Sequence, residues 1–65
     1  MATKGKIRDM LRILEKDGWV QVAQVGSHRQ LKHPSKPGRV TVSGKRNDDI
    51  DPKRWDSMMR QAGLE

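Results

Sequence analysis

Residues 19–42 read WVQVAQVGSHRQLKHPSKPGRVTV, and their pattern predicts the central sheet of the protein. β-Branched and other apolar residues are interspersed with polar ones in three short segments, at residues 19–25, 28–33 and 39–42. Gly26-Ser27 separates the first two runs, and the proline- and glycine-rich residues 34–38 separate the second from the third. The pattern predicts three short strands that form an antiparallel meander.

A helix is expected on each side of this meander. In the first, Thr3 is a possible N-cap and Gly18 ends the helix, while the second begins at Asp51-Pro52, where aspartate caps free amides and proline fits the first turn. Their apolar stripes are Ile7, Met10, Leu11 and Leu14 in the first helix, and Trp55, Met58, Met59 and Ala62 in the second. Residues 44–49 contain no apolar side chain and are expected to form a loop.

Both stripes need a surface to cover, and one face of the meander is available. We therefore expect a single α+β domain over residues 1–65, in α-β-β-β-α order, with both helices on one face of a three-stranded antiparallel sheet. The other sheet face is expected to be open to solvent.

The charge of the chain is concentrated in the predicted sheet. The net charge is +6, and residues 18–46 hold six basic side chains and no acid, while the two flanking segments carry +2 and −2. A field of one sign attracts polyanions or an acidic partner. With no cysteine there is no disulfide, no thiolate metal site and no thiol nucleophile.

Other composition features exclude further classes. Two histidines without a neighbouring carboxylate are too few ligands for zinc, so we predict no metal and no small-molecule cofactor. The chain has no apolar run long enough to span a bilayer and no signal-peptide pattern. We expect a soluble, cytoplasmic protein with no membrane partner.

His28 is the candidate for chemistry. Alternation in the second strand places His28, Gln30 and Lys32 on one face. Arg29, Leu31 and His33 fall on the other. If Leu31 faces the helices, His28 lies on the open face just after the Gly26-Ser27 turn. An imidazole can transfer protons near neutral pH, as phosphodiester cleavage requires. The competing interpretation is an ordinary exposed polar side chain.

His33 is not expected to act with His28. The two positions differ by an odd number and so face opposite sides of a regular strand. His33 also precedes Pro34, which favours a role in ending the strand. The chain has no Phe or Tyr that could stack on bases, and Trp19 and Trp55 are expected in the core.

Several short motifs, in order along the chain, resemble the HicA toxin family. They are Glu15-Lys16-Asp17-Gly18-Trp19, Gly26-Ser27-His28, His33-Pro34, Pro37-Gly38-Arg39-Val40-Thr41-Val42 and Arg60-Gln61-Ala62-Gly63-Leu64. The resemblance implies a double-stranded-RNA-binding-like fold and a ribosome-independent mRNA interferase that acts on single-stranded mRNA. It also implies neutralisation by a cognate HicB-like antitoxin that covers His28.

In that family the histidine of the Gly-Ser-His motif is catalytic, which corresponds to His28. The candidates for RNA contact are Ser27, Arg29, Lys32, Lys36, Arg39, Lys45 and Arg46. Many relatives have a proline and histidines after the third strand, where this chain has residues 43–49, SGKRNDD. Lys45 or Arg46 would then have to stabilise charge in their place.

Two other functions fit the same residues. A noncatalytic RNA-binding module would use the basic face only to hold the phosphate backbone, and its binding would be sensitive to salt. A protein-interaction domain would dock the same face on an acidic partner, which is compatible with a toxin masked by its antitoxin.

Overall fold

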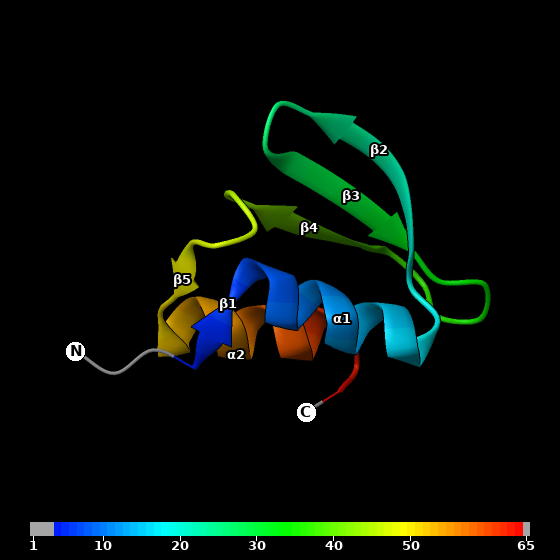
Figure 1. Cartoon of the computed structure of the whole chain (residues 1–65). Coiled ribbons are helices and arrows are strands. Elements are labelled where there is room, and N and C mark those ends of the chain that lie inside the picture. The colour runs from blue at the N-terminus through cyan, green and yellow to red at the C-terminus, as the bar shows by residue number, and fades with distance from the viewer. Residues whose placement is uncertain (1–3, 65) are drawn as a thin grey trace.

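The computed structural model describes residues 4–64 and confirms the predicted α+β fold. Figure 1 shows two helices lying beside each other beneath a curved three-stranded sheet. The elements in chain order are β1 (Gly5–Lys6), α1 (Ile7–Asp17), β2 (Val20–Val25), β3 (His28–Lys32), β4 (Arg39–Ser43), β5 (Asp49–Ile50) and α2 (Pro52–Gln61).

Each helix begins and ends at residues suited to it. The N-cap of α1 is Lys6, whose backbone N–H donates to the Asp9 carboxylate at 2.9 Å. The proposed cap Thr3 lies outside the described residues. Gly18 ends α1 with a φ of 106°, a left-handed conformation that favours glycine. Asp51 caps α2 as predicted, accepting the Arg54 N–H at 2.8 Å.

The sheet has the order β2-β3-β4 and is antiparallel throughout. In β3 and β4, the inward side chains Leu31, Val40 and Val42 are buried against the helices. The remaining core consists of Ile7, Met10, Leu11, Leu14, Trp19, Ile50, Met58 and Ala62. Trp19 is therefore a core residue, as expected, and Trp55 packs against the core from a partly buried position.

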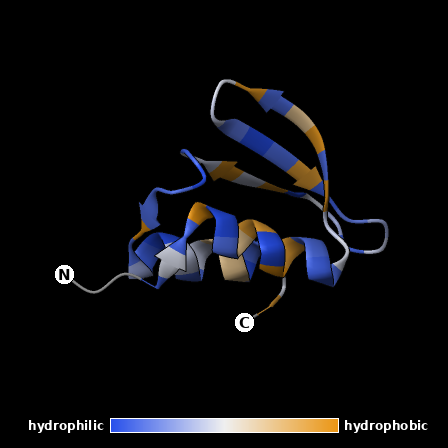
Figure 2. Cartoon of the chain, in the orientation of Figure 1, coloured by the Kyte–Doolittle hydropathy of each residue, from blue (hydrophilic) through white to orange (hydrophobic). Residues whose placement is uncertain are grey.

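The helices leave the edge strand β2 uncovered, whereas we expected them to cover one face of the whole meander. All six of its residues are exposed, and Figures 1 and 2 show β2 far from the helices, with hydrophobic and hydrophilic colours alternating along it. Val20, Val22 and Val25 are 59%, 50% and 77% exposed. The register of β2 against β3 shifts between Gln21 and Ala23, so Val22 lies at a β-bulge. The sheet bends away from two helices that are wide enough to cover only β3 and β4.

The second difference is a short β-pair that sequence inspection did not predict. Gly5 pairs with Ile50, and Lys6 with Asp49, which joins the start of α1 to the segment before α2. The predicted loop at residues 44–49 therefore ends within β5, where Ile50 is fully buried.

Within residues 4–64, neither helix has the length and apolar character needed to cross a membrane.

Candidate active site

His28 begins β3 on the open face of the sheet, as predicted. It is paired in register with Ser43 of β4 on one side and Val25 of β2 on the other. The imidazole is exposed, and its Nδ1 atom lies 3.2 Å from the Ser43 hydroxyl. A serine hydroxyl can accept a hydrogen bond from a protonated Nδ1 or donate to an unprotonated one. Ser43 can therefore support His28 in either state and leave Nε2 for a substrate.

The turn before His28 is held from inside the protein by Arg29. Arg29 is only 8% exposed, and its Nη1 donates to the carbonyl oxygens of Gly44, at 2.8 Å, and Ser27, at 3.4 Å. The Gly44 N–H also donates to the Ser27 carbonyl at 3.1 Å. These bonds join the β2–β3 turn to the end of β4. Arg29 thus lies on the inner face with Leu31, and its guanidinium is engaged by the backbone.

Two basic residues lie directly opposite each other at the far end of the open face. Lys32 of β3 pairs in register with Arg39 of β4, and like charges in such positions destabilise a sheet. Arg39 donates to the side-chain oxygen of Gln30. This bond directs the Arg39 side chain along the sheet toward the end that carries His28. Lys32 is four residues from His28, or about 13 Å along a strand. Lys32 therefore lies too far along the strand to contact the same small group as His28.

Lys36 and His33 form a separate cluster that closes the end of the core. Lys36 donates to the Asp17 carboxylate and to the Ala62 carbonyl oxygen, and so joins the ends of both helices. The Lys36 ammonium lowers the pKa of the Asp17 carboxyl below its ordinary value. The charge of Lys36 is therefore already engaged within the protein, although Lys36 is one of the residues predicted to contact RNA.

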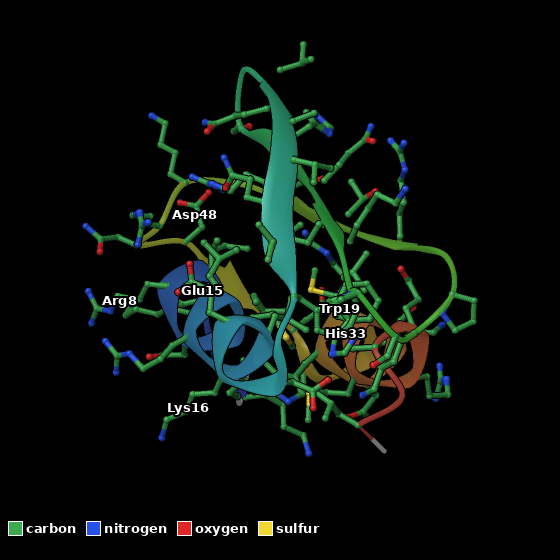
Figure 3. All side chains as sticks on the ribbon, turned by 90° about the vertical axis from the view of Figure 1, so that its right-hand side faces the viewer. Arg8, Glu15, Lys16, Trp19, His33 and Asp48 are labelled. Atoms are coloured by element: carbon green, nitrogen blue, oxygen red, sulfur yellow. The ribbon has the colours of Figure 1, made fainter. Side chains whose placement is uncertain are left out.

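His33 belongs to the same cluster and lies apart from His28, as strand alternation predicted. Its Nε2 is 2.6 Å from the Asp17 carbonyl oxygen, and its Nδ1 accepts the Ser35 and Lys36 N–H groups. Figure 3 shows its ring against Trp19, and the two rings meet edge to face with centroids 5.3 Å apart. These contacts give His33 a structural position.

Two of the three remaining candidates, Lys45 and Arg46, lie in the loop after β4, and Ser27 lies in the turn between β2 and β3. Lys45 and Arg46 are exposed, and the loop is fixed by the Lys45 N–H donating to Asp48 at 2.9 Å and by the Arg8 N–H donating to the Arg46 carbonyl at 3.0 Å. Lys45 follows Ser43 by two residues and is the basic residue nearest in sequence to that partner of His28. Ser27 is half-buried, and its carbonyl is used as described above.

Sequence inspection missed Arg54. Its Nη2 lies 3.4 Å from the Ser43 carbonyl oxygen, which brings a guanidinium from α2 to the strand end that holds His28. Of the acids in and beside α2, Asp51 caps the helix through the Arg54 N–H, and Asp56 pairs with Lys4 at 3.9 Å. Arg54 was overlooked because it lies in a segment of net negative charge. The pattern Asp51-Pro52, which fixes the start of α2, was the only signal for its position.

These features define a small α+β protein with an exposed histidine at the end of a basic sheet face. Among residues 4–64, no three His, Asp or Glu side chains gather in a position to hold a metal ion. Residues 7–64 match the model of the family described as HicA toxin of bacterial toxin-antitoxin. None of the curated proteins compared with the chain gives a match.

The chain belongs to the HicA toxin family, since the match covers nearly all of its length. It is accordingly the toxin component of a toxin–antitoxin system, and the family indicates a cognate antitoxin as its partner.

Proposed function

We propose that this toxin is a metal-independent mRNA endoribonuclease in which His28 transfers the proton. The proposal rests on an exposed imidazole whose Nδ1 is held 3.2 Å from the Ser43 hydroxyl, on the sheet face that also carries Lys32 and Arg39. In this reaction the 2′-oxygen of the ribose loses its proton and bonds to phosphorus, while the bond from phosphorus to the 5′-oxygen breaks and that oxygen gains a proton. His28 serves as the base for the first proton or the acid for the second.

Basic side chains support both binding and charge stabilisation. Lys32 and Arg39 hold phosphates along the open face, where an RNA backbone would also relieve the repulsion within their cross-strand pair. Lys45 and Arg46 lie in the loop that leaves β4 just after Ser43, and they are the candidates to counter the charge that develops on the reacting phosphate. A single imidazole contributes about 10²- to 10⁴-fold to such a reaction.

The test compares RNA cleavage by the wild type and by His28→Ala, with a chelator present throughout. We expect cleavage by the wild type and loss of at least about 100-fold in the variant. His33→Gln is the matched control because it removes the other of the two histidines, and circular dichroism checks that it is folded. Undiminished cleavage by His28→Ala would remove His28 from the mechanism, and loss of wild-type cleavage with chelator would contradict metal independence.

The same assay separates an enzyme from a noncatalytic RNA-binding module of double-stranded-RNA-binding-like fold. Such a module would bind RNA with strong salt dependence, release no products and be indifferent to His28→Ala. Product formation that depends on His28 excludes it.

We further propose that a HicB-like antitoxin neutralises the toxin by covering His28. Val25 is 77% exposed and pairs in register with His28, so a protein that buries the apolar surface of β2 would also cover the imidazole. Antitoxin and RNA should then compete for the toxin. Simultaneous binding of both to one molecule would refute this masking.

A further inference from the structure

A groove runs between the edge strand β4 and helix α2. It has a volume of about 260 Å³, and it is lined by Thr41 and Ser43 of the strand and Arg54, Ser57, Met58 and Gln61 of the helix. Pockets that enclose drug-sized ligands measure about 300–1,000 Å³. The groove is therefore of a size for one small planar group and not for a longer ligand.

The groove begins where the His28 site ends. Ser43 belongs to both: its hydroxyl contacts His28 Nδ1, and the residue is also part of the groove lining. Arg54 lies at the same end, with Nη2 3.4 Å from the Ser43 carbonyl oxygen. A polymer that crosses His28 toward the β4 edge of the sheet would enter the groove within one repeat unit.

The lining combines an apolar surface with polar groups that can both donate and accept hydrogen bonds. Met58 supplies the apolar surface: it is 5% exposed, and it lines the groove. Gln61 donates to the Ser57 hydroxyl at 3.3 Å, which leaves its amide oxygen and the Ser57 proton for a ligand. Amide and hydroxyl groups such as those of Gln61 and Ser57 can hydrogen-bond the edge of a nucleobase, and Met58 offers an apolar contact beside them.

Arg54 adds a charge suited to phosphate. A guanidinium presents five N–H donors in a planar fork, and within residues 4–64 the Arg54 side chain donates only to the Ser43 carbonyl oxygen, at 3.4 Å. The acids nearest in sequence to Arg54 are committed: Asp51 caps α2 and Asp56 pairs with Lys4.

We propose that this groove binds the nucleotide next to the cleaved bond, with its base against Met58, Ser57 and Gln61 and its phosphate on Arg54. The inference rests on the proposed RNA cleavage at His28 and adds the subsite through which the toxin selects bases. Arg54 is a binding residue for the flanking phosphate, and Gln61 is the residue that distinguishes one base from another.

The binding test uses the wild-type chain and hexanucleotides carrying 2′-O-methyl groups, which remove the nucleophile and so prevent cleavage. Amide chemical shifts of Thr41, Ser57 and Gln61 should change on titration with at least one of the homopolymers of A, C or U. Arg54→Gln should weaken binding by about tenfold. It should also reduce the steepness of the plot of log affinity against log salt concentration by about one, as expected for the loss of one phosphate contact. Arg12→Gln is the matched control, since it removes the same charge from an exposed position on α1.

A second measurement uses cleavable RNA. Gln61→Ala should change the relative kcat/KM among substrates that differ in the base beside the cut, and Arg12→Gln, on the exposed face of α1, should leave these ratios as in the wild type. Circular dichroism confirms that each variant is folded.

The outcomes distinguish this inference from the proposed function. Each of four results would overturn the subsite. Two concern RNA binding: chemical-shift changes on RNA titration that lie only outside the groove, or no binding at millimolar oligonucleotide. The others are equal effects of Arg54→Gln and Arg12→Gln on binding, or chemical-shift changes in the groove caused by antitoxin but not by RNA. If wild-type toxin cleaves no RNA, the proposed nuclease activity fails, and the titration with uncleavable RNA still decides whether the groove binds a nucleotide.

Discussion

The guanidinium of Arg29 donates to the carbonyl oxygen of Gly44 at 2.8 Å and thereby fixes the turn that presents His28 to the end of β4. Arg29→Met keeps an apolar stem of similar length but leaves the Gly44 carbonyl without this donor. We expect a loss of about 1–3 kcal/mol in the free energy of unfolding, measured by urea denaturation, together with slower RNA cleavage.

The control for Arg29 lies on the opposite face of the same strand. Lys32→Met removes an equal charge from an exposed position and relieves the repulsion with Arg39, so it should not lower the free energy of unfolding by more than about 0.5 kcal/mol. Equal destabilisation by the two variants would contradict the structural role of Arg29.

Gly18 is required both by its backbone and by its neighbour. An alanine Cβ at this position, with φ at 106°, would lie 2.8 Å from His33 Nε2 and would displace the ring from the Asp17 carbonyl. Gly38→Ala is the matched control, because φ there is 79° and no described atom lies within 4 Å of the added Cβ. Both variants should lose about 1–2 kcal/mol for the left-handed backbone, and Gly18→Ala about 1 kcal/mol more for the lost hydrogen bond. Thermal unfolding of the pair measures the difference, and equal losses would show that the contact with His33 contributes nothing.

Acid should weaken the protein through Asp17. Lys36 holds the pKa of this carboxyl below its ordinary value of 3.8, so the folded chain binds fewer protons here than the unfolded chain. The stabilisation is present above pH 3.8 and is lost as the pH falls through the lower pKa of the folded state. Urea denaturation over a series of pH values from about 5 to 2 should therefore show a flatter profile for Asp17→Asn and for Lys36→Met than for the wild type. An unchanged profile in Asp17→Asn would contradict this linkage.

The valines of β2 should matter to the antitoxin and not to the fold. Val25→Ser is expected to change the free energy of unfolding by no more than about 0.5 kcal/mol, whereas Leu14→Ala, in the core, should lose about 2–5 kcal/mol. If the antitoxin buries this valine, Val25→Ser should weaken toxin–antitoxin binding by about tenfold or more. Calorimetric titration measures the affinity, and an unchanged affinity would place the antitoxin elsewhere.

Much of this architecture follows from periodicity. Alternation correctly predicted that Leu31 faces the helices and that His28 and His33 lie apart, because one face of β3 is buried and its register is thereby fixed. The same alternation placed Arg29 on the inner face, yet its positive charge still made it a candidate for RNA contact. Charge identifies a residue type, but it does not reveal a backbone carbonyl such as that of Gly44.

The features that sequence inspection missed depend on contacts between distant segments. Gly5 and Ile50 carry no strand pattern of their own, and their pairing follows from the docking of the loop on α1. The exposure of β2 could not be foreseen because its valines predict a strand, and they give the same pattern whether or not a helix covers that strand. Arg54 reaches Ser43 only because α2 lies along β4, a relationship that no local motif encodes.

The edge position of β2 also has a consequence for protection against hydrogen exchange. Its backbone bonds run only to β3, and its side chains add little burial, so its amides should exchange through local opening at a free energy below that of global unfolding. Amides of Leu31 and Val40, between buried side chains, should exchange only when the whole domain unfolds. Because Val25 is the partner of His28, each such opening would release one wall of the site, and a bound partner on β2 would suppress it.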